Sequence, residues 1–182
     1  MRKEINQELE MPEGISCEYT LGSLSCKGNG LEVKRAMKIP GVNVIIHNTK
    51  ITLHCKKGNK NDYKTIMSNL AHIRNIFNGL NKKYIYHLEI CNVHFPMTVK
   101  IDKNKFMINN FLGEKTPRTA KIIKGVEVEV KGQKITVQSP DLEAAGQTAA
   151  NIEKATQIRK RDRRIFQDGI FITDKPGRNE NA

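Results

Sequence analysis

The stretch SPDLEAAGQTAANIEKATQIRKRDRRIFQDGIFITD, from Ser139 to Asp174, predicts a helix, a dense basic turn and a short apolar strand in immediate succession. Its first half carries apolar residues at helical spacing: Leu142, Ala145, Ala149 and Ile152. This spacing predicts a helix over residues 141–157 with one apolar face, and either Ser139 or Asp141 is suited to be its N-cap.

A basic segment follows the predicted helix directly. Five of the six positions from Arg159 to Arg164 are Lys or Arg, and only Asp162 interrupts them. Apolar residues come next, on both sides of residues 167–169: Ile165, Phe166, Ile170, Phe171 and Ile172. Because the charges lie between a packed helix and a packed strand, we expect them to be held in place and to face an anionic partner. We expect one or two of the arginines to pair instead with a nearby carboxylate: Asp162, Asp168 or Asp174.

The composition favours a polyanion as the partner. The chain has 182 residues, a formal net charge of +12 and a pI near 9.6. Six of its nine arginines lie in the second half, where their bidentate geometry suits phosphate better than lysine does. No apolar run approaches the ~20 residues of a membrane span, and the polar N-terminus does not resemble a signal peptide, so we expect a cytoplasmic protein without a membrane partner.

The four cysteines, Cys17, Cys26, Cys55 and Cys91, form no CxxC pair. In a reducing compartment we expect them to be free thiols that neither form a disulfide nor bind a metal. His87, Cys91 and His94, with Cys55, make a weaker alternative, because zinc sites usually contain two close pairs of ligands. We therefore expect no metal and no cofactor.

The chain repeats one plan at a constant offset. Gly41–Val44 (GVNV) corresponds to Gly125–Val128 (GVEV), and Lys50-Ile51-Thr52 to Lys134-Ile135-Thr136, both 84 residues apart. In each half a predicted hairpin precedes a predicted helix, which in the first half covers residues 62–78. The sequence therefore predicts an α+β fold made of two tandem copies, each a small antiparallel sheet with one helix on a face.

The boundary between the copies is expected near Tyr86, which gives domains of residues 1–85 and 86–182. Residues 1–14 are interpreted as a polar N-terminal arm, residues 56–62 as a polar loop, and Tyr84–Ile90 as the closing strand of the first copy. The predicted loop at residues 56–62 contains Lys and Gly but lacks the GxxxxGK[ST] pattern, which argues against nucleotide binding.

Four motifs carry a resemblance to a known family: HFPMTVKI (94–101), NFLGEKTPRTAKI (110–122), DLEAAGQTAANIEKAT (141–156) and RDRRIFQDGIF (161–171). In this order they resemble large-subunit ribosomal protein six in its archaeal and eukaryotic form, and the likeness covers nearly the whole chain. The resemblance implies a duplicated α+β fold in a structural, non-enzymatic protein that binds large-subunit rRNA mainly through its C-terminal domain. It also implies a position near the sarcin-ricin loop and the stalk base, beside neighbouring ribosomal proteins, where translational GTPases dock.

The residues themselves leave a second class open, an RNA-modifying enzyme or RNA chaperone with a duplicated fold. No cofactor motif, Ser/His/Asp set or HExxH pattern supports the catalytic version. We expect the RNA-binding residues to come from the loop 110–124 and from the segment after the second helix: Lys115, Arg118, Lys121, Lys124, Arg159, Lys160, Arg161, Arg163, Arg164 and Lys175.

Overall fold

The computed structural model describes residues 3–47, 49–162 and 164–177, and the chain divides into two compact units, Met1–Lys83 and Tyr84–Ala182. Each unit has its own hydrophobic core. No helix of the described residues is long and apolar enough to span a membrane.

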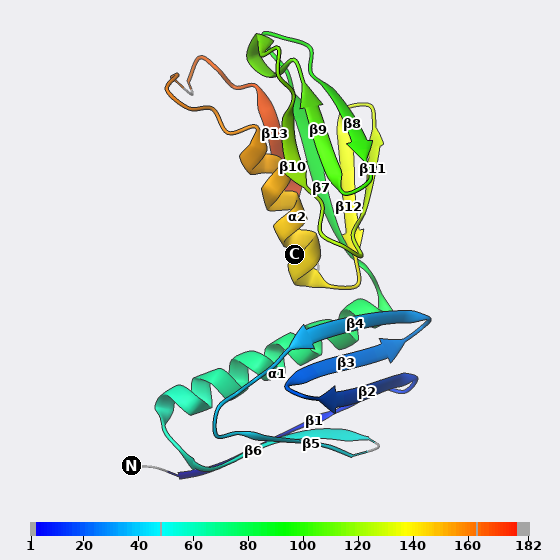
Figure 1. The fold of residues 1–182 in the computed structure, drawn as a ribbon, viewed down its shortest axis with the longest axis vertical. Helices are drawn as coiled ribbons and strands as arrows, with labels where there is room; N and C mark the ends of the chain where they lie inside the picture. Colours follow the sequence, from blue (N-terminus) through cyan, green and yellow to red (C-terminus); the bar gives the residue numbers. More distant parts are fainter. Residues whose placement is uncertain (1–2, 48, 163, 178–182) are drawn as a thin grey trace. The chain divides into compact units, whose positions relative to one another are not determined.

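Unit 1 contains two three-stranded antiparallel sheets and one helix (Figure 1). One sheet has the order β2-β3-β4, with β2 at Ile15–Thr20, β3 at Ser23–Gly28 and β4 at Leu31–Ala36. The other has the order β1-β6-β5, with β1 at Lys3–Glu10, β5 at Asn43–His47 and β6 at Lys50–Gly58. The helix α1, Lys60–Asn81, contacts strands of both sheets.

Unit 2 repeats this arrangement and adds one strand. Its smaller sheet has the order β10-β9-β8, with β8 at Thr98–Asp102, β9 at Lys105–Asn109 and β10 at Arg118–Lys121. Its larger sheet has the order β11-β12-β7-β13, with β7 at Tyr84–Cys91, β11 at Glu127–Lys131, β12 at Lys134–Ser139 and β13 at Gly169–Asp174. The helix α2 spans Leu142–Ala155, and a 3-10 turn, η1, spans Phe111–Gly113.

The two units have the same topology, so the predicted duplication and the α+β class are confirmed. β1, β5 and β6 pair as β7, β11 and β12 do, and in each unit the three-strand meander and the helix occupy the same places in the order. The strands β5 and β11 start 84 residues apart and also end 84 residues apart. Each unit has two sheets where one was expected, and β13 has no counterpart in unit 1 among the described residues.

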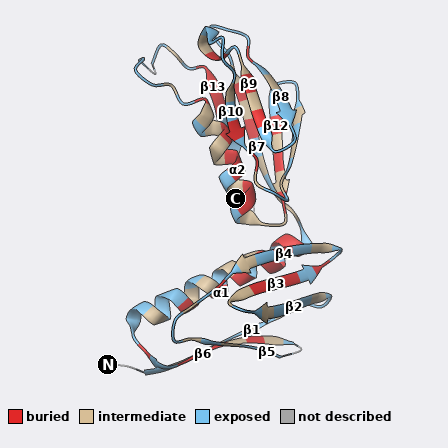
Figure 2. Cartoon of the chain, viewed as in Figure 1, coloured by how far each residue is buried: buried red, intermediate tan, exposed pale blue. Residues whose placement is uncertain are grey.

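The cores follow the alternation of the strands. Buried residues alternate with more exposed ones along the inner strands β3, β6, β9 and β12, as the colours of Figure 2 show. This period of two places one face of each sheet against the helix and its apolar side chains. In unit 1 the helix contributes Ile66, Leu70 and Ile73; in unit 2 it contributes Ala149 and Ile152.

The N-terminal residues form a strand, and the expectation of a polar arm is wrong. β1 pairs antiparallel with β6, and Ile5 and Leu9 pack against the core of unit 1. Glu, Gln and Asn dominate the segment, and these residue types are poor predictors of a strand. Only the alternation of Ile5, Gln7 and Leu9 indicates it, because these residues share one face.

The helix α1 begins two residues before its predicted start, because Asn59 caps it. The Asn59 side chain accepts hydrogen bonds from the amides of Asn61 and Asp62, and the Asp62 carboxylate accepts one from the Asn59 amide. This reciprocal pair is a capping box, which satisfies amides that a helix N-terminus otherwise leaves without partners. The first helical residue is therefore Lys60.

The other helix ends also differ from the prediction by two or three residues. α1 ends at Asn81, three residues beyond the predicted end at Asn78. α2 has Asp141 as its N-cap, one of the two candidates, and ends at Ala155, two residues before the predicted end. Apolar spacing places a helix well but does not fix its last turn, where capping contacts decide.

Residues 56–62 form the end of β6 and the start of α1, with Asn59 as the N-cap between them, where a polar loop was expected. Lys56 and Lys57 are exposed residues at the end of β6, and Lys60 is the first residue of α1. The strand β7, expected to close the first copy, belongs to unit 2, where it pairs with β12 and β13. The division between the units therefore falls between Lys83 and Tyr84.

Cys17 of β2 and Cys26 of β3 form a disulfide, so the expectation that no cysteine does so is wrong for this pair. The two residues face each other in the β2–β3 hairpin, with their Cα atoms 4.2 Å apart. The register of the hairpin brings them together, which a search for close Cys pairs in the sequence does not detect. Cys55 and Cys91 are free. Among the described residues, no group of three His, Cys, Asp or Glu side chains is arranged to hold a metal ion.

Candidate nucleic-acid interface

Two loops of unit 2 carry most of the predicted RNA-binding residues. The β9–β10 loop (residues 110–117) contains η1, and the basic loop (residues 156–168) joins α2 to β13. Figure 1 shows both loops at the same end of unit 2. The sequence does not establish that these segments meet, and the contacts of Arg118 show that they do.

Arg118, the first residue of β10, ties the two loops together. Its Nε and Nη2 donate to the two carboxylate oxygens of Glu114, at 2.8 Å and 2.6 Å. Its Nη1 donates to the carbonyl oxygens of Ala155 and Gln157, at 2.9 Å and 3.3 Å, and so satisfies groups at the C-terminus of α2. Four of the five N–H donors of a guanidinium are thereby used, which makes Arg118 a structural clamp.

The clamp lies against an aromatic ring and near a charged neighbour. The guanidinium carbon of Arg118 lies 4.3 Å from the ring centroid of Phe111, which is buried in the core. The hydrogen bond from Arg118 lowers the pKa of Glu114 despite the opposing effect of burial, and the charges of Arg118 and Arg161 lower it further. The bonds of Arg118 to Glu114 on one side and to Gln157 on the other bring the basic loop beside the β9–β10 loop.

Asp168 anchors the other end of the basic loop. Its carboxylate is buried and accepts hydrogen bonds from the amides of Val93 and His94, at 2.8 Å and 2.9 Å, and contacts His94 Nδ1 at 2.6 Å. Burial alone would raise the pKa of Asp168, but these hydrogen bonds outweigh it and hold the pKa below its usual range. Asp168 therefore pairs with His94, whereas the sequence suggests an arginine partner.

The basic loop is further supported by Phe166 and Asp162. The Phe166 ring centroid lies 5.0 Å from that of His94 and 4.8 Å from the guanidinium carbon of Arg161. Asp162 accepts a hydrogen bond from the Arg164 amide at 2.9 Å, which shapes the loop internally. The loop thus holds its charges through backbone and ring contacts.

The nine predicted residues that the structure describes separate into three groups. One group is exposed on the two loops: Lys115, Arg159, Lys160, Arg161 and Arg164. Arg118 is the internal clamp, and Arg163 lies outside the described residues. The remaining three are exposed but lie away from the loops: Lys121, Lys124 and Lys175.

Hydrogen bonds show how β10 leads away from the loops along α2. The Lys121 carbonyl accepts from Asn151, and the Ile123 amide donates to Thr148, whereas Arg118 reaches Ala155. From residue 155 to 148 a helix advances about 10 Å, so Lys124 lies roughly that far from the clamp. Lys175 follows the far end of β13, about 20 Å from Gly169 at the rise of a strand.

Sequence reasoning misses several residues of this region. Lys154 is exposed at the end of α2 and lines a shallow pocket together with Arg118 and Arg159. The role of His94 depends on a partner that the sequence does not identify, because 74 residues separate it from Asp168. The motif RDRRIFQDGIF contains Asp168, yet only the fold shows which side chain it meets.

Comparison with known proteins adds a family to this geometry. The model of the family described as "Ribosomal protein L6" matches residues 95–169. The large ribosomal subunit protein uL6 of Methanococcus vannielii is 40% identical over 174 residues, covering 96% of each chain. The uL6 protein of Methanocella arvoryzae is 40% identical, covering 96% of this chain and 99% of its own, and that of Haloarcula marismortui is 38% identical, covering 95% and 97%.

The chain belongs to the uL6 family. The resemblance inferred from the four motifs is therefore confirmed. The segment that matches the uL6 family model begins one residue after His94 and ends one residue after Asp168. It thus spans both loops of the candidate interface, and the His94–Asp168 contact joins the chain next to its two ends.

Proposed function

We propose that this protein is a structural, non-enzymatic constituent of the large subunit of the cytoplasmic ribosome and binds large-subunit rRNA through unit 2. Membership of the uL6 family over nearly the full length carries this proposal. The exposed charges of the two loops support it, since they are held beside each other by the Arg118 clamp and the Asp168 anchor. Backbone phosphates are the groups that such fixed Lys and Arg side chains recognise.

The finer location is also a proposal, and it rests on the resemblance. We propose that the protein lies near the sarcin-ricin loop and the stalk base, beside neighbouring ribosomal proteins and close to where translational GTPases dock. Hydroxyl-radical footprinting of large subunits with and without the protein tests this, because protection should map to those rRNA elements. Protection confined to other regions would contradict the location and leave the rRNA-binding role intact.

Salt dependence tests the binding surface. Each phosphate that the protein neutralises releases counterions, so every such contact adds about 0.7 to 0.9 to the slope of log affinity against log salt. Replacing Arg159, Arg161 and Arg164 with Ala should therefore make the slope shallower by about 2 to 3 and weaken binding to a large-subunit rRNA transcript.

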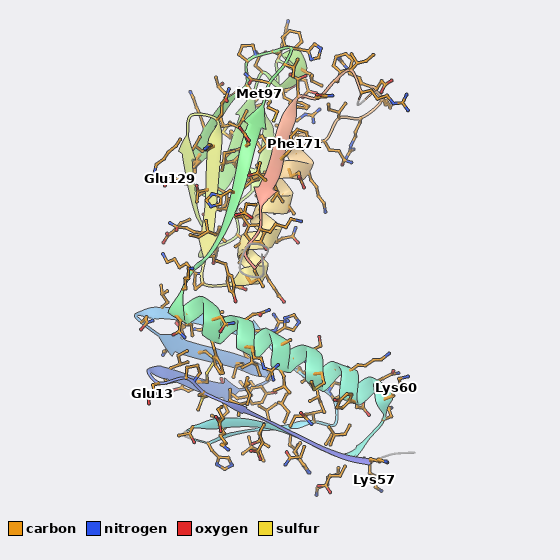
Figure 3. The ribbon with its side chains drawn as sticks, turned by 180° about the vertical axis from the view of Figure 1, so that it is seen from behind. Glu13, Lys57, Lys60, Met97, Glu129 and Phe171 are labelled. Carbon is orange, nitrogen blue, oxygen red and sulfur yellow. A yellow bond between two sulfur atoms is a disulfide. The ribbon has the colours of Figure 1, made fainter. Side chains whose placement is uncertain are left out.

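The matched control removes three charges from unit 1. Lys56, Lys57 and Lys60 are exposed where β6 leads into α1, and Figure 3 labels Lys57 and Lys60. Replacing these three with Ala should change the slope much less, although the net charge falls by the same amount. A larger change of the slope in the lysine variant would show that the binding surface lies on unit 1.

Co-sedimentation of the tagged protein with large subunits at equal stoichiometry tests the ribosomal role itself.

A further inference from the structure

A mainly apolar pocket of about 760 Å³ opens beneath the basic loop. Its walls come from the C-terminal end of α2, the basic loop, β13 and the end of β7 and its following loop. Side chains that matter to the proposal line it: Cys91, Lys154, Gln157, Ile158, Phe166 and Phe171. The volume lies within the roughly 300–1,000 Å³ typical of pockets that hold a small organic ligand.

An aromatic ring is available at this pocket. Phe171, labelled in Figure 3, is 44% exposed although its strand neighbour Ile170 is fully buried. Its ring lies over Gly169, since a Cβ atom at position 169 would be 3.1 Å from Phe171 Cζ. Glycine at this position therefore lets the ring lie against the backbone and present its other face. A flat apolar ligand can stack there.

The rim of the pocket is basic, which favours an anionic ligand. Lys154 lines the pocket directly, and Arg159 lines the adjoining shallow pocket that shares Lys154 and Gln157. Two carboxylates also line the pocket, but both are engaged by the fold: Glu153 accepts a hydrogen bond from the Ile172 amide, and Asp168 accepts from the amides of Val93 and His94. Arg161 lies against Phe166, another lining residue. An apolar floor with a basic rim fits a flat ring joined to a phosphate, which describes a nucleotide. Exposed carboxamides such as that of Gln157 can bond to the edge of a base.

The walls are held in place before any ligand binds. Asp168 fixes the end of the basic loop to Val93 and His94, and the Thr156 hydroxyl accepts a hydrogen bond from the Ile170 amide at 2.9 Å. These contacts join the loop, α2, β7 and β13 around the opening. A preformed site loses less conformational entropy on binding than one that must first be ordered.

We propose that this pocket binds one unstacked base of the RNA that contacts the basic loop, an inference that rests on the rRNA-binding function proposed above. The base stacks on Phe171, Gln157 bonds to its edge, and Lys154 and Arg159 contact the flanking phosphates. Specific recognition of RNA commonly uses such splayed bases stacked on aromatic side chains.

The test compares full-length variants on RNA that lacks single bases. The probe is the large-subunit rRNA transcript of Methanococcus vannielii, from which about one base per molecule has been removed chemically. Phe171→Ala should weaken binding to the intact transcript about tenfold, within the range that removal of one stacking ring produces. Phe171→Tyr should bind as the wild type does, and Tyr63→Ala, which removes a ring 46% exposed in unit 1, should have no effect.

Base removal at one nucleotide should weaken binding to the wild type and leave binding to Phe171→Ala unchanged. If circular dichroism shows that Phe171→Ala is not folded, Gln157→Ala replaces it in the test, because this substitution alters only an exposed side chain. Removal of the base at the same nucleotide should then weaken binding to Gln157→Ala less than it weakens binding to the wild type. If no nucleotide shows this dependence while wild-type binding remains salt-dependent, the pocket proposal is wrong. If the wild type binds no large-subunit rRNA, the proposed function itself fails.

Discussion

Arg118 and Asp168 show how single residues fix the geometry of the interface. The sequence context of each suggests a contact between an arginine and an anion, yet the structure uses both residues internally. Arg118 donates to Glu114 and to carbonyls at the end of α2, and Asp168 accepts from Val93 and His94. The proposed contact with RNA therefore falls to the exposed loop residues.

The clamp role of Arg118 predicts reduced stability with unchanged phosphate contacts. Arg118→Gln should lower the free energy of unfolding by about 1–2 kcal/mol, since it removes charge-assisted hydrogen bonds at a partly exposed site. Its salt slope for rRNA binding should stay close to that of the wild type. Arg159→Gln should do the opposite, with a shallower slope and unchanged stability. Urea unfolding and salt titrations measure both, and a shallower slope for Arg118→Gln would show that Arg118 contacts phosphate.

The lowered pKa of Asp168 predicts a stability that depends on pH. A carboxyl whose pKa is lower in the folded state stabilises that state fully above its unfolded pKa, about 3.9, and this contribution disappears as the pH falls through the folded pKa. Asp168→Asn should therefore cost about 1.5–3 kcal/mol at pH 7, and the difference from wild type should shrink below about pH 4. Thermal unfolding at about pH 7, 5 and 3 measures this. Asp102→Asn, at an exposed aspartate of β8, is the control. An equal loss of stability in Asp168→Asn at all three pH values would contradict the stabilising role of the Asp168 carboxylate.

At the scale of elements, the helix of unit 2 packs closely against β7. Gly146 lies within α2, and a Cβ atom there would be 2.9 Å from the hydroxyl oxygen of Tyr86 and 3.3 Å from its Cζ. Glycine is a poor helix former, so the close approach of Tyr86 accounts for its presence. Burial of the Tyr86 side chain raises the pKa of its phenol, which agrees with this packing.

This packing predicts that two substitutions are coupled. Gly146→Ala should bring no gain in the wild type, because the tyrosine hydroxyl must move aside. In a Tyr86→Phe background the same change should gain up to about 1 kcal/mol, the difference in helix propensity between Ala and Gly. A double-mutant cycle from urea unfolding measures the coupling. Equal effects of Gly146→Ala in both backgrounds would show that Tyr86 does not limit this position.

At the scale of the whole molecule, two copies of one topology differ in what they add to it. Unit 2 has the strand β13 and the basic loop that leads to it, and its meander contains the longer β9–β10 loop with η1. These additions carry the exposed residues Arg159, Arg161 and Arg164 and the Glu114 partner of the clamp, and they supply most of the residues that line the pocket. Unit 1 keeps tight hairpins at the corresponding positions, with β3 and β4 joined through Asn29 and Gly30. The duplicated fold is therefore a common framework, and the function proposed here belongs to the insertions of one copy.

The α+β class, the duplication and the family can all be predicted from the sequence alone. The helical spacing from Leu142 to Ile152 and the four motifs are formed by residues close together in the chain. The 84-residue offset comes from comparing two such stretches. None of these patterns requires knowledge of tertiary contacts. Tertiary structure alone decided the pairing of Cys17 with Cys26, the strand at Lys3–Glu10 and the contacts of Arg118 and Asp168. These depend on hairpin register and on residues up to 75 positions apart. A charged side chain shows its role only when its neighbours are known, because the same guanidinium can hold a loop or grip a phosphate.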